Sequence, residues 1–220
     1  MKPVHIVIVA KAPQAGFAKT RLIGALGAQG AADLARRMLA QTLQTALAAD
    51  LGTVELCVTP APGAPVWRAL RKTLPGRVQW SDQGSGDLGD RMARAARRVL
   101  DGGTSVLLIG TDCPQLGSAQ LHRAAAALNG ADAVLIPAFD GGYVLLGLAR
   151  FDVSLFDGIA WSSASVATET LRRLQQLGWT VQCQPALHDI DEAHDLQWLP
   201  AGWLPKTGLP TDHVKRTRSH

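Results

Sequence analysis

The chain alternates short apolar runs with longer amphipathic stretches. Residues 4–10 form a continuous apolar run, which is typical of a parallel strand buried on both faces. Residues 30–49 instead place Leu34, Met38 and Leu43 at helical spacing. The same two patterns predict strands at 4–10, 53–59, 77–81, 105–109, 133–137, 143–148 and 180–184, and helices at 30–49, 66–74, 88–100, 118–128 and 165–177. This alternation predicts an α/β fold, a three-layer α/β/α arrangement around a mainly parallel sheet.

The pattern shows neither an internal repeat nor a linker, so it predicts one domain over residues 1–199. A chain of 220 residues is long enough for such a domain to bury a sizeable core. Prolines and glycines recur after Leu199 and the ending is basic. Residues 200–220 are therefore predicted to form an extended, partly disordered tail, which Trp198 and Trp203 would order in part by docking on the domain.

Composition narrows the class of protein. Apolar residues make up 47% of the chain and charged residues 18%, which excludes a disordered protein. The net charge of +4 is spread along the chain, so we expect attraction to small anions and not binding of nucleic acid. No signal-peptide pattern and no apolar run of membrane-spanning length occur, and we expect a cytoplasmic protein. Cys57, Cys113 and Cys183 are accordingly expected to be reduced residues of the core.

A basic loop follows the first predicted strand directly. It carries Lys11, Lys19 and Arg21, together with Gly16 and a threonine hydroxyl, within residues 11–22. Because open α/β sheets bind ligands at the carboxyl ends of their strands, this loop is a candidate phosphate site. A solvated surface loop is the alternative. The loop lacks the glycine spacing of a P-loop, so that motif is excluded.

Residues 84–89 match the dinucleotide pattern G-x-G-x-x-G, but they follow the third predicted strand and not the first. Asp87 and Asp90 would also place negative charge where a pyrophosphate should lie. A nicotinamide enzyme is therefore a weaker hypothesis. The spacing of His188 and His194 and the lack of Cys-x-x-Cys, H-E-x-x-H and G-x-S-x-G patterns argue against a zinc site and an α/β-hydrolase.

Three acidic segments lie where predicted strands end. Asp112 follows residues 105–109 and could hold a divalent cation against phosphates, or instead form an Asx-turn or a helix cap. Asp189 and Asp191 alternate after the last strand and can face one side, so with Asp112 they form a candidate magnesium or manganese site. A helix cap is the alternative for Asp191. In the third segment, Asp140-Gly-Gly-Tyr143, the glycines let backbone approach a ligand, or simply form a hairpin turn.

As an ordered set, these motifs resemble bacterial transferases of the GT-A superfamily, a family of largely unknown function that is often called glycosyltransferase-like and is similar to phospholactate guanylyltransferase. The resemblance covers residues 3–199 and rests on Lys11-Ala-Pro…Gly16…Lys19-Thr-Arg21-Leu22, Gln83-Gly…Gly86-Asp87-Leu88-Gly89…Arg91-Met92, Gly110-Thr-Asp112-Cys-Pro114, Asp140-Gly-Gly-Tyr143, Trp161-Ser162 and Asp189-Ile-Asp191…Asp195-Leu196. It implies a nucleotide-diphospho-sugar transferase fold, a nucleotide lying over the first loop and a divalent metal.

The motifs and the resemblance together assign roles to individual residues. Nucleotide binding is expected of Lys11, Ala12, Gly16, Lys19, Arg21, Gln83, Gly86, Asp87 and Leu88. Acceptor binding is expected of Asp140, Gly141, Gly142, Tyr143 and Trp161, although Trp161 could equally be a packing residue. Metal binding is expected of Asp112, Asp189 and Asp191. The expected catalytic residues are Lys19, Arg21 and Asp112.

The leading hypothesis is a cytoplasmic transferase that depends on Mg²⁺ or Mn²⁺. It would bind a nucleotide donor, either a nucleotide sugar or a nucleoside triphosphate, and move a glycosyl or nucleotidyl group to a small acceptor. One alternative is a guanylyltransferase-like nucleotidylyltransferase acting on a small phosphorylated acid. Another, of a different class, is a non-catalytic nucleotide sensor. Neither nucleic acid nor a membrane is an expected partner.

Overall fold

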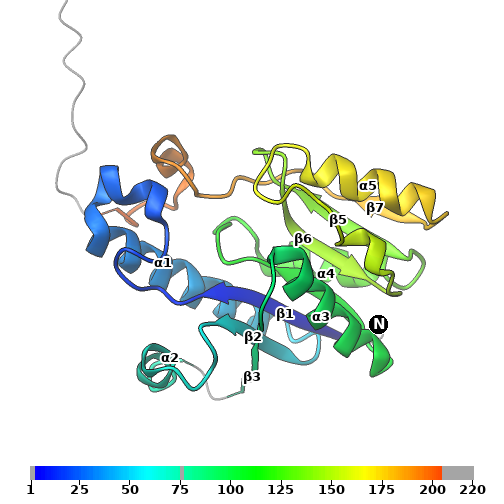
Figure 1. Ribbon diagram of the computed structural model, residues 1–220, viewed down its shortest axis with the longest axis horizontal. Coiled ribbons are helices and arrows are strands. Elements are labelled where there is room, and N and C mark those ends of the chain that lie inside the picture. The colour runs from blue at the N-terminus through cyan, green and yellow to red at the C-terminus, as the bar shows by residue number, and fades with distance from the viewer. Residues whose placement is uncertain (1–2, 75–76, 205–220) are drawn as a thin grey trace, which may run out of the picture.

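A seven-stranded sheet runs through the described part of the protein, which is residues 3–74 and 77–204 of the computed structural model (Figure 1). Its strands are β1 (Val4–Lys11), β2 (Val54–Thr59), β3 (Gln79–Asp82), β4 (Ser105–Ile109), β5 (Ala133–Pro137), β6 (Tyr143–Leu148) and β7 (Val181–Cys183). They lie in the order β3-β2-β1-β4-β6-β5-β7. Strand β6 is antiparallel to β4 and β5, and the other pairs are parallel. The predicted mainly parallel sheet is thus confirmed.

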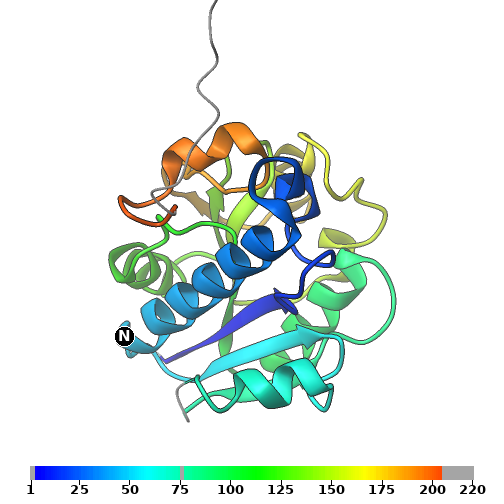
Figure 2. The same cartoon turned by 90° about the vertical axis from the view of Figure 1, so that its left-hand side faces the viewer.

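Helices cover both faces of this sheet. The α-helices among the described residues are α1 (Ile23–Ala48), α2 (Pro65–Leu70), α3 (Leu88–Asp101), α4 (Ser118–Ala127) and α5 (Val166–Gln176), and the 3-10 helices are η1 (Thr20–Leu22), η2 (Val153–Leu155) and η3 (Ala193–Trp198). Leu43 of α1, Trp67 of α2 and Leu121 of α4 are buried on one face. Ala96 of α3 and Leu174 of α5 are buried on the other. Figure 2 shows α1 lying alongside β1 and β2. The three-layer prediction is confirmed.

Three local predictions differ from the structure, and the first is the helix predicted over 66–74, which ends at Leu70. Helix α1 begins at Ile23 and not at residue 30, with a break at Gly27, whose φ of 70° is accessible to glycine. No residue from 23 to 30 is fully buried, and only Ile23 and Leu26 in this segment pack against an apolar cluster, so its helical pattern is weaker than that of the rest of α1. Cys183 is exposed because β7 is a short edge strand, and its assignment to the core is wrong, whereas Cys57 and Cys113 are buried as expected.

The segment after β7 packs beside the start of α1. The contact is a small apolar cluster of Leu22, Ala31, Leu34, Met38, Ile190 and Leu196. Trp203 packs against this cluster, with the Arg37 guanidinium carbon 4.5 Å from its ring centroid. Trp198 instead stacks on His188 at 3.8 Å between ring centroids. The remainder of the predicted tail, 205–220, lies outside the described residues.

No helix in residues 3–74 and 77–204 combines the length and the apolar character that a membrane crossing requires.

Candidate functional site

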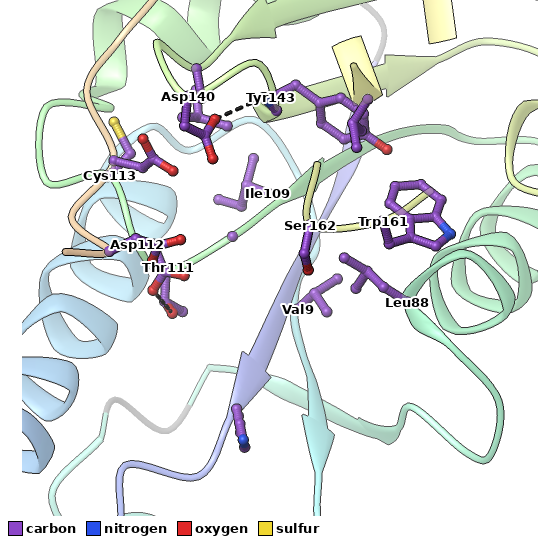
Figure 3. A pocket seen from close by; sticks show the side chains of 18 of the residues that line it. Val9, Leu88, Ile109, Thr111, Asp112, Cys113, Asp140, Tyr143, Trp161 and Ser162 are labelled. Atoms are coloured by element: carbon purple, nitrogen blue, oxygen red, sulfur yellow. Dashed lines mark hydrogen bonds between the residues drawn. The ribbon is translucent and has the colours of Figure 1, made fainter. Parts of the chain in front are cut away.

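A cleft of about 530 Å³ opens where β1 and β4 end. Its walls also include the start of α3, the β5–β6 turn, residues 161–163 and the segment after β7. Figure 3 shows Asp112 and Asp140 toward one end of the cleft and Leu88 and Trp161 toward the other. The cleft therefore occupies the sheet edge at which α/β proteins bind ligands.

The loop after β1 supplies positive charge to the cleft. Lys11, Lys19 and Arg21 all line it. Lys19 has left-handed backbone geometry, with φ of 51° and ψ of 45°, which non-glycine residues rarely adopt. The ammonium of Lys11 lies 4.1 Å from the ring centroid of Phe17, a cation–π contact within the same loop. The loop thus holds its two lysines in different surroundings.

The ammonium of Lys19 joins two carboxylates. Its Nζ lies 2.6 Å from Asp191 Oδ1 and 2.9 Å from Asp112 Oδ1, and the lysine side chain is only 7% exposed. Burial by itself lowers the pKa of a lysine, but the two carboxylates outweigh it and hold the pKa of Lys19 above its ordinary value. Lys19 therefore stays charged at neutral pH and ties the end of β4 to the segment after β7.

A group of three carboxylates forms beside this lysine. Oxygen atoms of Asp140, Asp189 and Asp191 all lie within 4.8 Å of one another. Asp140 follows β5 and Asp189 follows β7, and the parallel pairing of these strands is extended by a bridge between Ala138 and Leu187. Burial raises the pKa of Asp189 to about 7, and the charges of Asp140 and Asp191 add to the increase. Such crowding of like charge is relieved when a cation binds.

Asp112 stands outside this three-carboxylate group. Its side chain is 45% exposed and pairs with Lys19, and its backbone carbonyl accepts a hydrogen bond of 2.9 Å from the Ile190 N–H. It does not cap the next helix, since Gly117 is the N-cap of α4. The geometry thus groups Asp140, which was expected to bind the acceptor, with Asp189 and Asp191, which were expected to bind metal. Asp112, the third expected metal ligand, contacts Lys19 instead.

Gln83 fills the wall between β1, β2 and α3. It is 3% exposed, and its Nε2 donates to Ala10 O at 3.0 Å and to Cys57 O at 2.9 Å. Its Oε1 accepts from Arg91 Nη1 at 3.1 Å, and Arg91 Nε donates to Gly86 O at 3.0 Å. The side-chain amide of Gln83 therefore makes its hydrogen bonds within the protein. One of these bonds holds the guanidinium of Arg91 in position.

The β5–β6 turn packs against the loop before α5. Gly141 has φ of 93°, and a Cβ there would overlap the backbone of Ala164. The hairpin alternative for these glycines is confirmed, because β5 and β6 are antiparallel neighbours. Tyr143 and Trp161 line the cleft beside this contact, as does Ser162, whose φ of 64° is again unusual for a residue with a Cβ.

The cleft brings together most of the residues expected from the sequence. Those that line it are Lys11, Lys19, Arg21, Gln83, Leu88, Asp112, Asp140, Gly142, Tyr143, Trp161, Asp189 and Asp191. Those that do not are Ala12, Gly16, Gly86, Asp87 and Gly141. Ala12 is fully buried in the core, and Asp87 caps α3 by accepting a hydrogen bond from the Asp90 N–H.

Other residues line the cleft without a role assigned from the sequence, among them Phe17, Arg91, Thr111 and Ser162. Several arginines share the polar side of α3, and nothing in their spacing says which one faces a ligand. Cys113 also lines the cleft, but burial raises the pKa of its thiol to about 11. A thiol with a pKa this high is protonated at neutral pH, and the thiolate is the nucleophilic form.

The sheet order, the layers and the cleft define the nucleotide-diphospho-sugar transferase fold. A candidate nucleotide-diphospho-sugar transferase from Desulfovibrio desulfuricans G20 is 32% identical and superposes with a TM-score of 0.82, covering 89% of this chain and 85% of the other. Residues 42–163 match the family described as uncharacterised proteins conserved in bacteria, DUF2064, and the chain belongs to that family. No curated protein matches significantly.

More distant structures share the fold alone. A nucleotidyl transferase from Methanothermobacter is 14% identical with a TM-score of 0.59, over 90% of this chain and 96% of the other. A CMP-2-keto-3-deoxy-manno-octonic acid synthetase solved with CTP is 12% identical with a TM-score of 0.54, over 89% and 96%. The expected fold and the resemblance to GT-A-like transferases are confirmed.

Proposed function

We propose that this protein is a divalent-metal-dependent transferase that binds a nucleotide donor and moves a glycosyl or nucleotidyl group to a small acceptor. One observation carries the proposal. The cleft that Lys11 and Arg21 line also holds Asp140, Asp189 and Asp191 with oxygens within 4.8 Å of one another. Cations on one wall and metal-binding carboxylates on another suit the phosphate chain of a nucleotide.

The donor atoms fit magnesium or manganese. All three are carboxylate oxygens, the ligands that hard divalent cations prefer, and carboxylates that bind such ions usually share them with phosphate oxygens and water. Burial and the neighbouring charges of Asp140 and Asp191 raise the pKa of Asp189, and Lys19 offsets this increase only in part. When bound, such a metal neutralises charge that develops on phosphate oxygens. Asp140, Asp189 and Asp191 would hold it.

The protein's own side chains would orient the donor. Lys11 and Arg21 lie on the loop that follows β1, where they can contact phosphate oxygens. Lys19 would hold Asp112 and Asp191 at fixed separation and could exchange one of them for a phosphate. Both transfer reactions place negative charge on phosphate oxygens, so the same cleft suits a nucleotide-sugar donor and a nucleoside triphosphate.

Calorimetry tests this proposal directly. We expect nucleoside diphosphates and triphosphates to bind the purified protein with Mg²⁺ or Mn²⁺ present, and to bind at least roughly tenfold more weakly with excess EDTA. Asp189→Asn should abolish the metal dependence, and Asp101→Asn, an exposed residue at the end of α3, is the matched control. Absence of binding by every nucleotide tested would contradict the proposal.

Product analysis separates the enzyme from a nucleotide sensor. Incubation with nucleotide sugars and nucleoside triphosphates, together with phosphorylated and unphosphorylated small acids and alcohols, should release nucleoside diphosphate in glycosyl transfer and pyrophosphate in nucleotidyl transfer. Metal-dependent binding without either product on any donor–acceptor pair would favour the sensor.

A further inference from the structure

The cleft has two chemically different ends. Asp112 and Asp140 mark the acidic end, and Leu88 and Trp161 mark the other (Figure 3). Phosphates and metal belong at the acidic end, as proposed above. The base of a bound nucleotide would then reach the end formed by the start of α3.

Apolar side chains form the wall at that end. Leu88 is 41% exposed, Met92 is buried, and Tyr143 Oη lies 3.8 Å from Met92 Sδ. Trp161 packs against Gly89, where a Cβ would lie only 2.6 Å from its Nε1. Flat apolar walls of this kind suit a nucleobase better than a phosphate chain.

Arg91 stands within this apolar wall. It lies between Leu88 and Met92 on the first turns of α3 and lines the cleft. A guanidinium carries five N–H donors in a rigid fork, and Arg91 uses only Nε, toward Gly86 O, and Nη1, toward Gln83 Oε1. Among the described residues no acceptor takes its Nη2 hydrogens and no carboxylate pairs with it.

The other arginines on α3 contact other parts of the protein. Arg94 donates to the backbone oxygens of Gln83 and Ser85, and Arg98 pairs with Glu55. The guanidinium carbon of Arg97 lies 4.8 Å from the ring centroid of Phe151. Arg91 is thus the arginine of this helix that lines the cleft with free donors.

Gln83 holds the guanidinium of Arg91 in a fixed position. Its Nε2 is bound to a carbonyl of β1 and to a carbonyl of β2, so its Oε1 is fixed relative to the sheet. Arg91 is attached to that oxygen at 3.1 Å. Holding a donor pair in place before the ligand arrives reduces the entropy lost on binding.

We propose that Arg91 reads the base of the donor nucleotide by donating to two adjacent acceptors on one edge, with Gln83 as its positioning residue. This inference rests on the proposed function. Guanine offers such a pair in O6 and N7, and cytosine offers one in O2 and N3. Adenine places a donor beside N7, and uracil separates its two carbonyls by an N–H, so neither base presents the pair.

Nucleoside diphosphates test the inference, because they are common to both donor types. With Mn²⁺ present, we expect GDP or CDP to bind the wild-type protein roughly ten- to a hundredfold more tightly than ADP and UDP. A preference for GDP that 7-deaza-GDP loses assigns the N7/O6 edge of guanine, and a preference for CDP assigns cytosine. Arg91→Ala should lower the affinity for the preferred diphosphate to that for ADP and UDP. Arg97→Ala should leave the preference between bases unchanged.

Gln83→Glu tests the positioning role of Gln83 and keeps a side chain of similar size in the wall of the cleft. The ratio of the affinity for the preferred diphosphate to the affinity for ADP should fall, because the phosphate and metal contacts common to both ligands cancel from that ratio. Equal binding of all four diphosphates by the wild type, or a preference that survives Arg91→Ala, would overturn the inference and leave the proposed function standing. Failure of every diphosphate to bind would overturn both.

Discussion

Lys19 Nζ lies 2.6 Å from Asp191 Oδ1, across 172 positions of sequence. Asp191 is also a member of the three-carboxylate group, so one side chain serves both an internal ammonium and a candidate metal site. Lys19 therefore places a positive charge directly beside the candidate metal ligands. Replacing Lys19 by a neutral residue would leave these carboxylates without that positive charge, and a metal ion could balance their negative charge instead.

Lys19→Met should increase the affinity for Mn²⁺ measured without nucleotide. The change frees an Asp191 oxygen and removes a neighbouring positive charge, and a gain of roughly tenfold corresponds to about 1.4 kcal/mol. Calorimetric titration with Mn²⁺ measures it. Lys11→Met is the matched control, because Lys11 lies on the same loop but its ammonium packs on Phe17. Unchanged or weaker Mn²⁺ binding would show that Lys19 does not compete for the site.

Asp140→Asn and Asp112→Asn distinguish two possible metal sets. The sequence pattern groups Asp112 with Asp189 and Asp191, whereas the geometry groups Asp140 with them. We expect Asp140→Asn to weaken Mn²⁺ binding by roughly tenfold or more, and Asp112→Asn to weaken it less, because the loss of a ligand outweighs the loss of a nearby charge. The reverse order in calorimetry would restore the set predicted from the sequence.

Glu55 should make the protein sensitive to acid. Burial by itself would raise the pKa of Glu55, but hydrogen bonds from His5, Arg98 and Ser81 outweigh it and lower the pKa from 4.5 to about 2. A lowered pKa stabilises the folded protein above about pH 4.5, and this contribution is lost as pH falls from 4.5 toward 2. It amounts to at most about 3 kcal/mol. Urea unfolding between pH 3 and pH 6 measures the slope.

Glu55→Gln provides the comparison for that pH series. The variant is expected to be less stable at neutral pH, since Arg98 loses its charged partner. Its free energy of unfolding should nevertheless change less between pH 6 and pH 3 than that of the wild type. Parallel pH profiles for the two proteins would remove Glu55 as a source of the acid sensitivity.

Gly141→Ala should destabilise the turn that carries Asp140. The new Cβ would overlap the backbone of Ala164, and φ of 93° strains any residue with a side chain. We expect a loss of about 1–3 kcal/mol in the free energy of unfolding, together with weaker Mn²⁺ binding. Gly130→Ala is the control, because no atom lies within 4 Å of its Cβ position. Equal thermal stability of the two variants would contradict the packing role of this turn.

The apolar patterns alone predicted nearly every strand and helix. A run such as residues 106–109 is a local property, since burial on both faces favours an apolar side chain at every position. For the same reason, the local pattern was enough to predict that Asp112, Asp140 and Asp189 follow the ends of strands. It failed at Cys183, because the exposure of an edge strand depends on which strands lie beside it.

Only the tertiary structure decided which of these side chains meet. Asp140 joins Asp189 because β5 and β7 are parallel neighbours, and the strand order that makes them so does not follow from the spacing of residues. Asp112 pairs with Lys19 because β4 lies beside β1. Arg91 faces the cleft because Gln83 is fixed by carbonyls of two strands far from it in sequence. The sequence determined the chemical groups, and long-range strand pairing determined the constellation they form.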